Sequence, residues 1–197
     1  MNLSSFLLIL ITVVMCGSVA LNSGALFTNS DLSFSEPSKI EIVQITAGDR
    51  YNDTMRFQDN VLLLKHAGGP PLPLDSISVQ ILGTGNAYKG TPGSGGRLIY
   101  GGIEIHYENL SADKKNICFG KNNAEMVKDG VWSTGEILIL TGNDSLNASS
   151  PGISVMVDGE NGTSNNYGLS AGTDVEISIY QKNEVGTHLI FKKTARI

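Results

Sequence analysis

The chain has two patterns of hydrophobic and polar positions, which meet near residue 38. No charged residue lies between Phe6 and Phe27, and the first half of this run has no polar face. From residue 39 onward, apolar and polar residues alternate with a period of two in short runs. A helix that is apolar all round must be buried in a membrane or among other helices, whereas alternation is typical of half-buried strands.

Nine short runs after residue 38 have the character of β-strands. Strict alternation places Ile77, Val79 and Ile81 on one face of the third run. Turn-forming glycine, proline, Asp-Gly and Asn-Gly sequences separate the runs, and residues 124–128 predict one short helical turn at most. The runs are KIEIVQIT, NVLLLKH, SISVQIL, RLIYGG, IEIHYEN, EILILTG, GISVMVD, DVEISIY and HLIFKKTA.

Together the two patterns predict an α+β fold: a long N-terminal apolar α-helix followed by an all-β, Ig-like antiparallel β-sandwich. We expect the helix over residues 1–27, a hinge over residues 28–38, and the sandwich over residues 39–197. About 22 helical residues extend roughly 33 Å, which is enough to cross a hydrocarbon core of about 30 Å.

The apolar segment lacks the positive charge that normally orients such a segment in a membrane, since the first basic residue is Lys39. Three interpretations stay open. It is a cleaved secretory signal, with a small-residue end at residues 18–20, or a plain membrane anchor. Alternatively, a basic leader has already been removed before Met1 and the helix stays in the mature protein, which is the interpretation that explains the missing charge.

In "NVLLLKHAGGPPLPLDSISVQI" an expected strand ends in a His-x-Gly-Gly turn before a second strand, and this stretch resembles the corresponding segment of archaeal type IV pilins. "VWSTGEILILTG", followed by "PGISVMVDGENG", resembles the later Trp…Gly-Glu strand and the turn that follows the next strand. Archaellins, the subunits of the archaeal motility filament, share this plan. The resemblance implies a leader peptidase, an assembly motor and a polymer of identical subunits.

The apolar helix also favours a polymer on physical grounds. It carries large side chains that are each worth about 1.5–3 kcal/mol when buried, and a helix projecting from a sandwich cannot bury them alone. A bundle of helices from many subunits can, and a repeated screw operation generates a filament. The residues expected in this filament core are Phe6, Leu7, Leu8, Ile9, Leu10, Ile11, Val13, Val14 and Met15.

Composition and candidate chemistry exclude several other functions. The net charge of −5 leaves no basic surface for nucleic acid. The two cysteines, Cys16 and Cys118, lie in different environments, so we expect neither a disulfide between them nor a zinc site. The glycine-rich "GTPGSGG" lacks the residues of a phosphate-binding loop, and "DGENGTSNN" is a solvated turn rather than a calcium loop.

The three histidines, His66, His106 and His188, do not stand in a nucleophile motif. We expect His66 to cap or pack at the turn that follows it, and Trp132 and Phe191 to be core residues. The sequence therefore predicts no catalytic, cofactor-binding or metal-binding residues and no cofactor.

Asn-x-Ser/Thr triplets are the modification signal in this chain, because several fall in predicted loops. Glycosylation candidates outside the apolar helix are Asn52, Asn109, Asn143, Asn147 and Asn161, and a further triplet begins at Asn2 within the buried helix.

These observations predict a non-enzymatic structural subunit of an extracellular archaeal surface filament, stored in the membrane before assembly. An archaellin of the motility filament is one alternative. A membrane-anchored or secreted β-sandwich that binds a polymer or a protein, including the accessory proteins of the motility machine, is another. A secreted hydrolase is disfavoured because no catalytic motif is present.

Overall fold

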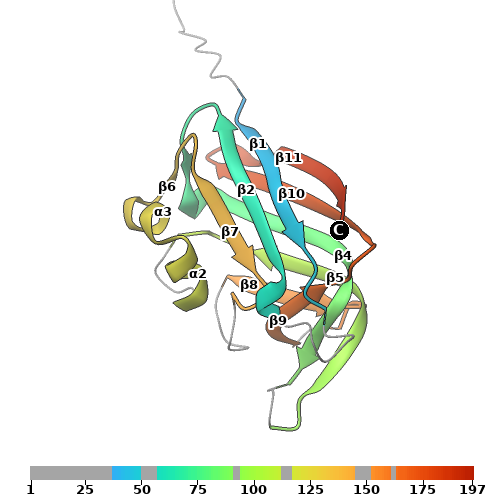
Figure 1. The fold of residues 1–197 in the computed structure, drawn as a ribbon. Coiled ribbons are helices and arrows are strands. Elements are labelled where there is room, and N and C mark those ends of the chain that lie inside the picture. The colour runs from blue at the N-terminus through green and yellow to red at the C-terminus, as the bar shows by residue number, and fades with distance from the viewer. Residues whose placement is uncertain (1–36, 50–56, 91–93, 112–116, 145–151, 161–162) are drawn as a thin grey trace, which may run out of the picture. The chain divides into compact units, whose positions relative to one another are not determined.

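The computed structural model describes residues 37–49, 57–90, 94–111, 117–144, 152–160 and 163–197 (Figure 1). Residues Glu36–Ile197 form one compact unit. Strands make up 60% of the described residues, so this part of the chain is an all-β structure. The sandwich that the alternating pattern predicts is confirmed, because two antiparallel sheets lie face to face around a common core.

The predicted α+β class with a long apolar helix is wrong. The two α-helices of the described residues, α2 (Ile117–Asn122) and α3 (Ala124–Asp129), have six residues each. Neither these nor any other helix in the described ranges is long and apolar enough to cross a membrane. Residues 1–27, which include the expected filament-core positions 6–15, lie outside the described residues.

The two helices are short because their ends are fixed by other contacts. Asn123 separates them and uses its side chain on a neighbouring strand, while α3 ends at Gly130, which has a left-handed φ of 75°. Glycine adopts this conformation without steric cost, and its N–H bonds to the carbonyl of Met126. The single helical turn expected at residues 124–128 corresponds to α3, whereas α2 has no counterpart in the prediction.

The first sheet has three strands in the order β1-β2-β7: β1 (Lys39–Thr46), β2 (Val61–Gly68) and β7 (Ile137–Thr141). The second sheet has the order β11-β10-β4-β5-β8, and β9 pairs with the far half of β4. Its strands are β4 (Ile77–Lys89), β5 (Arg97–Tyr107), β8 (Ile153–Val157), β9 (Thr163–Leu169), β10 (Asp174–Asn183) and β11 (Gly186–Arg196).

A small ribbon and two 3₁₀ turns complete the described structure. The ribbon consists of β3 (Leu72–Pro73) and β6 (Val131–Trp132), paired antiparallel. The 3₁₀ turns are η1 (Phe57–Asp59) and η2 (Leu74–Ser76). Along the chain, β3 and η2 lie between β2 and β4, and β6 lies between α3 and β7, so each ribbon strand stands where the chain passes from one sheet to the other.

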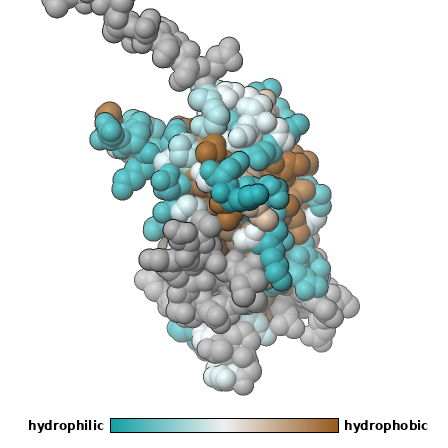
Figure 2. Space-filling view, turned by 90° about the vertical axis from the view of Figure 1, so that its left-hand side faces the viewer, coloured by the Kyte–Doolittle hydropathy of each residue, from teal (hydrophilic) through white to brown (hydrophobic). Residues whose placement is uncertain are grey.

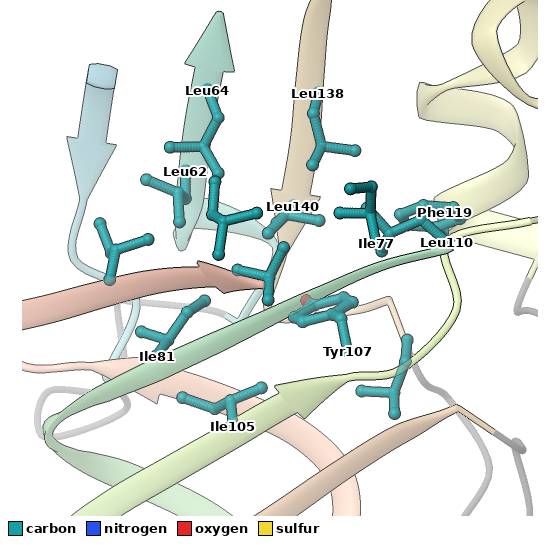
Figure 3. Close-up of a cluster of buried hydrophobic side chains, with 14 of the residues drawn as sticks. Leu62, Leu64, Ile77, Ile81, Ile105, Tyr107, Leu110, Phe119, Leu138 and Leu140 are labelled. Atoms are coloured by element: carbon teal, nitrogen blue, oxygen red, sulfur yellow. The ribbon is translucent and has the colours of Figure 1, made fainter. Parts of the chain in front are cut away.

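The core lies between the two sheets, where the inward positions of the alternating runs meet (Figure 3). Leu62 and Leu64 of β2 face Ile81 of β4 and Ile105 of β5, and each of the four is at most 1% exposed. Full burial of a Leu or Ile side chain contributes about 1.5–3 kcal/mol. The period of two therefore decides which residues form the core.

Glycines at 101 and 102 connect what the sequence suggested were two strands, "RLIYGG" and "IEIHYEN", into the single strand β5. A Cβ at Gly101 would lie 2.1 Å from the Oδ2 atom of Asp158. Gly101 therefore permits a close approach between two segments of chain rather than a turn. β9 was not expected, because its sequence TSNNYGL is mostly polar and does not alternate.

Candidate functional site

The turn after β2 and the turn after Trp132, both singled out in the sequence, meet at one place, which we call the His66–Trp132 junction. It comprises the end of β2 with the following turn (residues 66–69), the β3–β6 ribbon, and the turn at residues 133–136. Leu72 pairs with Trp132 in the ribbon, and the N–H of Leu74 bonds to the carbonyl of Gly130 at 2.9 Å. Segments about 60 residues apart in sequence are thus held side by side.

Backbone hydrogen bonds close the junction around His66. Its N–H donates to the carbonyl of Glu136 at 3.0 Å, and its carbonyl accepts from the N–H of Gly135 at 2.7 Å. The indole Nε1 of Trp132 donates to the same Glu136 carbonyl at 3.2 Å. The Glu136 carboxylate accepts from the N–H of Ser133 at 2.5 Å, which closes the turn. The Trp…Gly-Glu sequence is therefore a turn that fits against the His66 backbone.

The two aromatic side chains of the junction are fully buried. His66 and Trp132 are both 0% exposed, and their ring centroids lie 5.8 Å apart with the planes inclined by 46°. Neither ring nitrogen of His66 has a hydrogen-bond partner among the described residues. The imidazole is therefore packed in the core against Trp132, as expected from its position before the turn.

The turn after His66 contacts the first described residues of the chain. Gly69 has a φ of 99°, and a Cβ at this position would lie 2.8 Å from the Cα of Ser38. Lys39 pairs with Gly68 at the start of β1, and Thr134 Oγ1 donates to the carbonyl of Gly69 at 3.1 Å. The junction thus holds the segment that follows residue 36 against β2 and the 133–136 turn.

No family model matches this chain, and no curated protein matches it. The properties of the junction therefore rest on its own contacts.

A second buried polar cluster joins the two sheets at the end of β7. We call it the Asp144 latch; it consists of Tyr107, Thr141, Asp144 and Tyr167. Tyr107 donates to Asp144 Oδ2 at 3.0 Å, and the Tyr107 and Tyr167 hydroxyls lie 2.7 Å apart. Thr141 donates to the same carboxyl group from its N–H and from its hydroxyl, at 2.7 Å each. The latch thus links β7 to β5 and β9.

Burial changes the acid–base properties of the latch. Asp144 is 0% exposed, and desolvation raises its pKa to about 6, although the hydrogen bonds from Thr141 and Tyr107 oppose this shift. Desolvation also raises the pKa values of Tyr107 and Tyr167, and the nearby Asp144 charge adds to both shifts. Both tyrosines therefore stay protonated, and the latch is a structural network with no described opening to solvent.

One further histidine and three acidic residues have partners on the surface. His106 Nε2 lies 2.6 Å from Glu104 Oε1, and this hydrogen bond lowers the pKa of Glu104, as does a second one from Gln80. In the turn that begins at Asp158, which the sequence predicted to be a solvated turn rather than a calcium loop, Asp158 Oδ1 accepts a hydrogen bond from the N–H of Gly102. Glu160 forms an ion pair with Lys89. Both carboxylates thus have partners within the fold.

Shallow depressions and scattered apolar residues mark the described surface. One depression of about 260 Å³ is lined by Arg97–Tyr100, Val157, Asp158 and Glu160, and another of about 330 Å³ lies beside α2, α3 and the start of β7. Figure 2 views the side that carries α2, α3 and β7, where hydrophobic atoms appear among hydrophilic ones. Ile137 at 41% and Val43 at 52% are the exposed large apolar residues of the first sheet. Neither depression has the enclosed apolar shape that is usual for a small-molecule site.

The other predicted residues fall into three groups. Trp132 is in the core as expected, and Phe191 is partly buried against it. Asn109 and Asn143 are described, while the candidates Asn52, Asn147 and Asn161 and the Asn2 triplet lie outside the described residues.

The sequence did not single out Asp144, Tyr107, Tyr167 or Asn123, because an acidic residue or an amide in a polar run gives no sign of burial. Only Tyr107 had a signal, because it continues the inward alternation of Ile103 and Ile105 in the predicted run IEIHYEN.

Proposed function

We propose that this protein is a structural subunit of an extracellular archaeal surface filament of the type IV pilus kind, polymerising through its apolar segment at residues 1–27. The sandwich is then the outer part of each subunit. Its partners are identical subunits, the membrane before assembly, a leader peptidase and an assembly motor. The proposal includes no catalytic activity, no cofactor and no nucleic-acid partner.

The observation that carries the proposal is the His66–Trp132 junction. One turn from each of the two stretches that resemble pilins meets the other through His66, Gly135 and Glu136, although the turns are distant in the chain. The part PGISVMVDGENG lies elsewhere, since β8 pairs with β5. If the resemblance of these short stretches to pilins were a coincidence, there would be no reason to expect contact between them in the fold. Their association supports the view that the resemblance reflects a shared structural device.

The position of the junction supports the same function. A filament subunit must transmit force between the segment that assembles and the domain that is displayed. Here the chain at residues 37–39 contacts the turn at Gly69 and pairs with β2, so a pull on it is shared with the first sheet and the ribbon.

The burial requirement of residues 6–27 is the physical reason for polymerisation. Leaving so many large apolar side chains in water would cost on the order of 20 kcal/mol, far more than the stability of a typical domain. Association of these segments from many subunits removes that cost, and a head-to-tail arrangement that does not close extends without limit.

The test is electron microscopy of the purified full chain beside a variant that lacks residues 1–27. We expect filaments from the full chain, and a soluble monomer by light scattering from the truncated chain, because the truncated form keeps the whole sandwich core. Long filaments from the truncated chain would refute assembly through residues 1–27. A full chain that stays monomeric under all assembly conditions would instead favour the binding-module alternative, and loss of cell motility on gene deletion would favour an archaellin.

A further inference from the structure

We propose that Asn109 carries an N-linked glycan in the mature protein and that Asn143 does not. Both begin an Asn-x-Ser triplet, Asn109-Leu110-Ser111 and Asn143-Asp144-Ser145, so the sequence alone treats them alike. The inference rests on the proposed function in one respect: the sandwich must be displayed outside the cell, where such modification takes place.

Asn109 presents its amide nitrogen to solvent. The residue is exposed and lies in the loop after β5 with a φ of 51°, a left-handed conformation that asparagine tolerates well. Its Oδ1 accepts from the N–H of Ser111 at 3.0 Å and from the Ser111 hydroxyl. Within the described part of the chain its Nδ2 has no hydrogen bond, so the amide is held by its oxygen and its nitrogen is available.

The residues on each side of Asn109 fix the loop to the sandwich. The N–H of Glu108 donates to the carbonyl of Gly152 at 2.7 Å, and that of Leu110 donates to the carbonyl of Leu74 at 2.8 Å. The Leu110 side chain is 0% exposed and packs in the core. Asn109 is therefore the outward point between two anchored residues, and a large group on its nitrogen would extend into solvent without displacing the fold.

Asn143 has the opposite setting. It is half buried, and its neighbours Gly142 and Asp144 are both buried. A Cβ at Gly142 would lie 2.0 Å from the carbonyl oxygen of Tyr167, so the chain is tightly enclosed immediately before Asn143. Asp144 is the central residue of the latch. A glycan on Asn143 would have to be accommodated beside these contacts.

The reaction is a glycosyl transfer from a lipid-phosphate-linked oligosaccharide. Asn109 Nδ2 forms a bond to C1 of the first sugar, and the bond between C1 and the phosphate oxygen breaks. The lipid phosphate leaves with the electron pair, and one proton of the amide passes to a base of the transferase. No oxidant or metal redox step is involved, and the chain supplies only the acceptor nitrogen and the Ser111 hydroxyl.

The test is peptide mapping and intact-mass spectrometry of the full chain purified from the surface of cells that produce it, with three variants beside it. We expect a sugar mass on the Asn109 peptide and none on the Asn143 peptide. Asn109→Gln and Ser111→Ala should each lower the intact mass by one glycan, whereas Asn143→Gln should change it only by the substitution. Ser111→Ala keeps the asparagine, so it remains informative if Asn109→Gln folds poorly.

An unmodified Asn109 peptide in surface material, or loss of a glycan in Asn143→Gln, would overturn the proposal. Filament formation by the same samples is scored separately by electron microscopy. A glycan on Asn109 of a monomeric surface protein would leave this inference standing and refute the filament function, and filaments without that glycan would do the reverse.

Discussion

Asp144 shows at the scale of one residue how burial sets a property that composition does not reveal. Its carboxyl group is fully buried, and its only titratable neighbours in the latch are Tyr107 and Tyr167. With a pKa raised to about 6, the folded protein favours the protonated acid. A group of this kind stabilises the fold below its unfolded pKa of about 4, and the contribution is lost as the pH rises through about 6.

We therefore predict that Asp144→Asn flattens the pH dependence of stability. The raised pKa corresponds to roughly 3 kcal/mol of stability that the native protein loses between about pH 4 and pH 6. Asparagine keeps the shape and can accept from Thr141 N–H while donating to the Thr141 hydroxyl. Urea unfolding at pH 4.5 and 7.5 measures the effect, with the exposed Asp174→Asn as the matched control. Equal pH dependence of the Asp144→Asn variant and the native protein would contradict the prediction.

At the scale of elements, Asn123 explains how the edge of the first sheet is closed. Its Oδ1 accepts from the N–H of Ile139 at 2.8 Å, and its Nδ2 donates to the carbonyl of Ile139 at 2.8 Å. A second bond joins Nδ2 to the carbonyl of Phe119 in α2 at 3.0 Å. The amide side chain of Asn123 thus makes the two backbone hydrogen bonds that a neighbouring strand would make at the edge of β7, and it links α2 to that edge.

Replacing Asn123 with alanine should destabilise the protein by about 2–4 kcal/mol. The substitution removes these bonds and leaves the backbone groups of Ile139 without partners in a partly buried position, where each costs about 1–3 kcal/mol. The neighbouring exposed residue supplies the control, since Asn122→Ala should change stability by less than about 0.5 kcal/mol. Urea unfolding and amide exchange at Ile139 test this, and similar results for the two variants would show that the edge is not held by Asn123.

At the scale of the whole molecule, the proposed filament places opposite demands on the two parts of the chain. A charged side chain at residues 6–15 should prevent assembly, because in a filament core the charge would be buried without a partner at a cost of several kcal/mol. The surface of the sandwich must stay polar. Lys182, an exposed residue of β10, belongs to that surface.

Leu10→Asp should therefore abolish filaments, whereas Lys182→Asp should leave their number unchanged. Both variants introduce an aspartate, so the comparison separates the position of the charge from its sign. Filament yield by negative-stain electron microscopy is the measurement, and thermal unfolding of both variants checks that the sandwich is intact. A normal filament yield from Leu10→Asp would show that residue 10 is not enclosed by other subunits.

The sequence by itself determined the sandwich. Short apolar runs between turn signals, strictly alternating for β8 and β10, predicted β1, β2, β7, β8, β10 and β11 to within three residues of their observed bounds. Trp132 was expected in the core as a large aromatic residue, and His66 was expected to cap or pack because it precedes a turn; both side chains are buried. The strand pattern did not predict β9, whose polar sequence pairs with β4.

Only the tertiary structure decided which distant residues act together. That His66 meets Glu136, that Tyr107 and Tyr167 enclose Asp144, and that Asn123 closes β7 are all long-range contacts, and no periodicity along the chain encodes them. The same holds for the Asn-x-Ser triplets that begin at Asn109 and Asn143, because the first asparagine is exposed and the second is half buried. The physical reason is that a local pattern fixes which face of an element is apolar, whereas sheet order and packing fix which polar groups lose their water and must find partners.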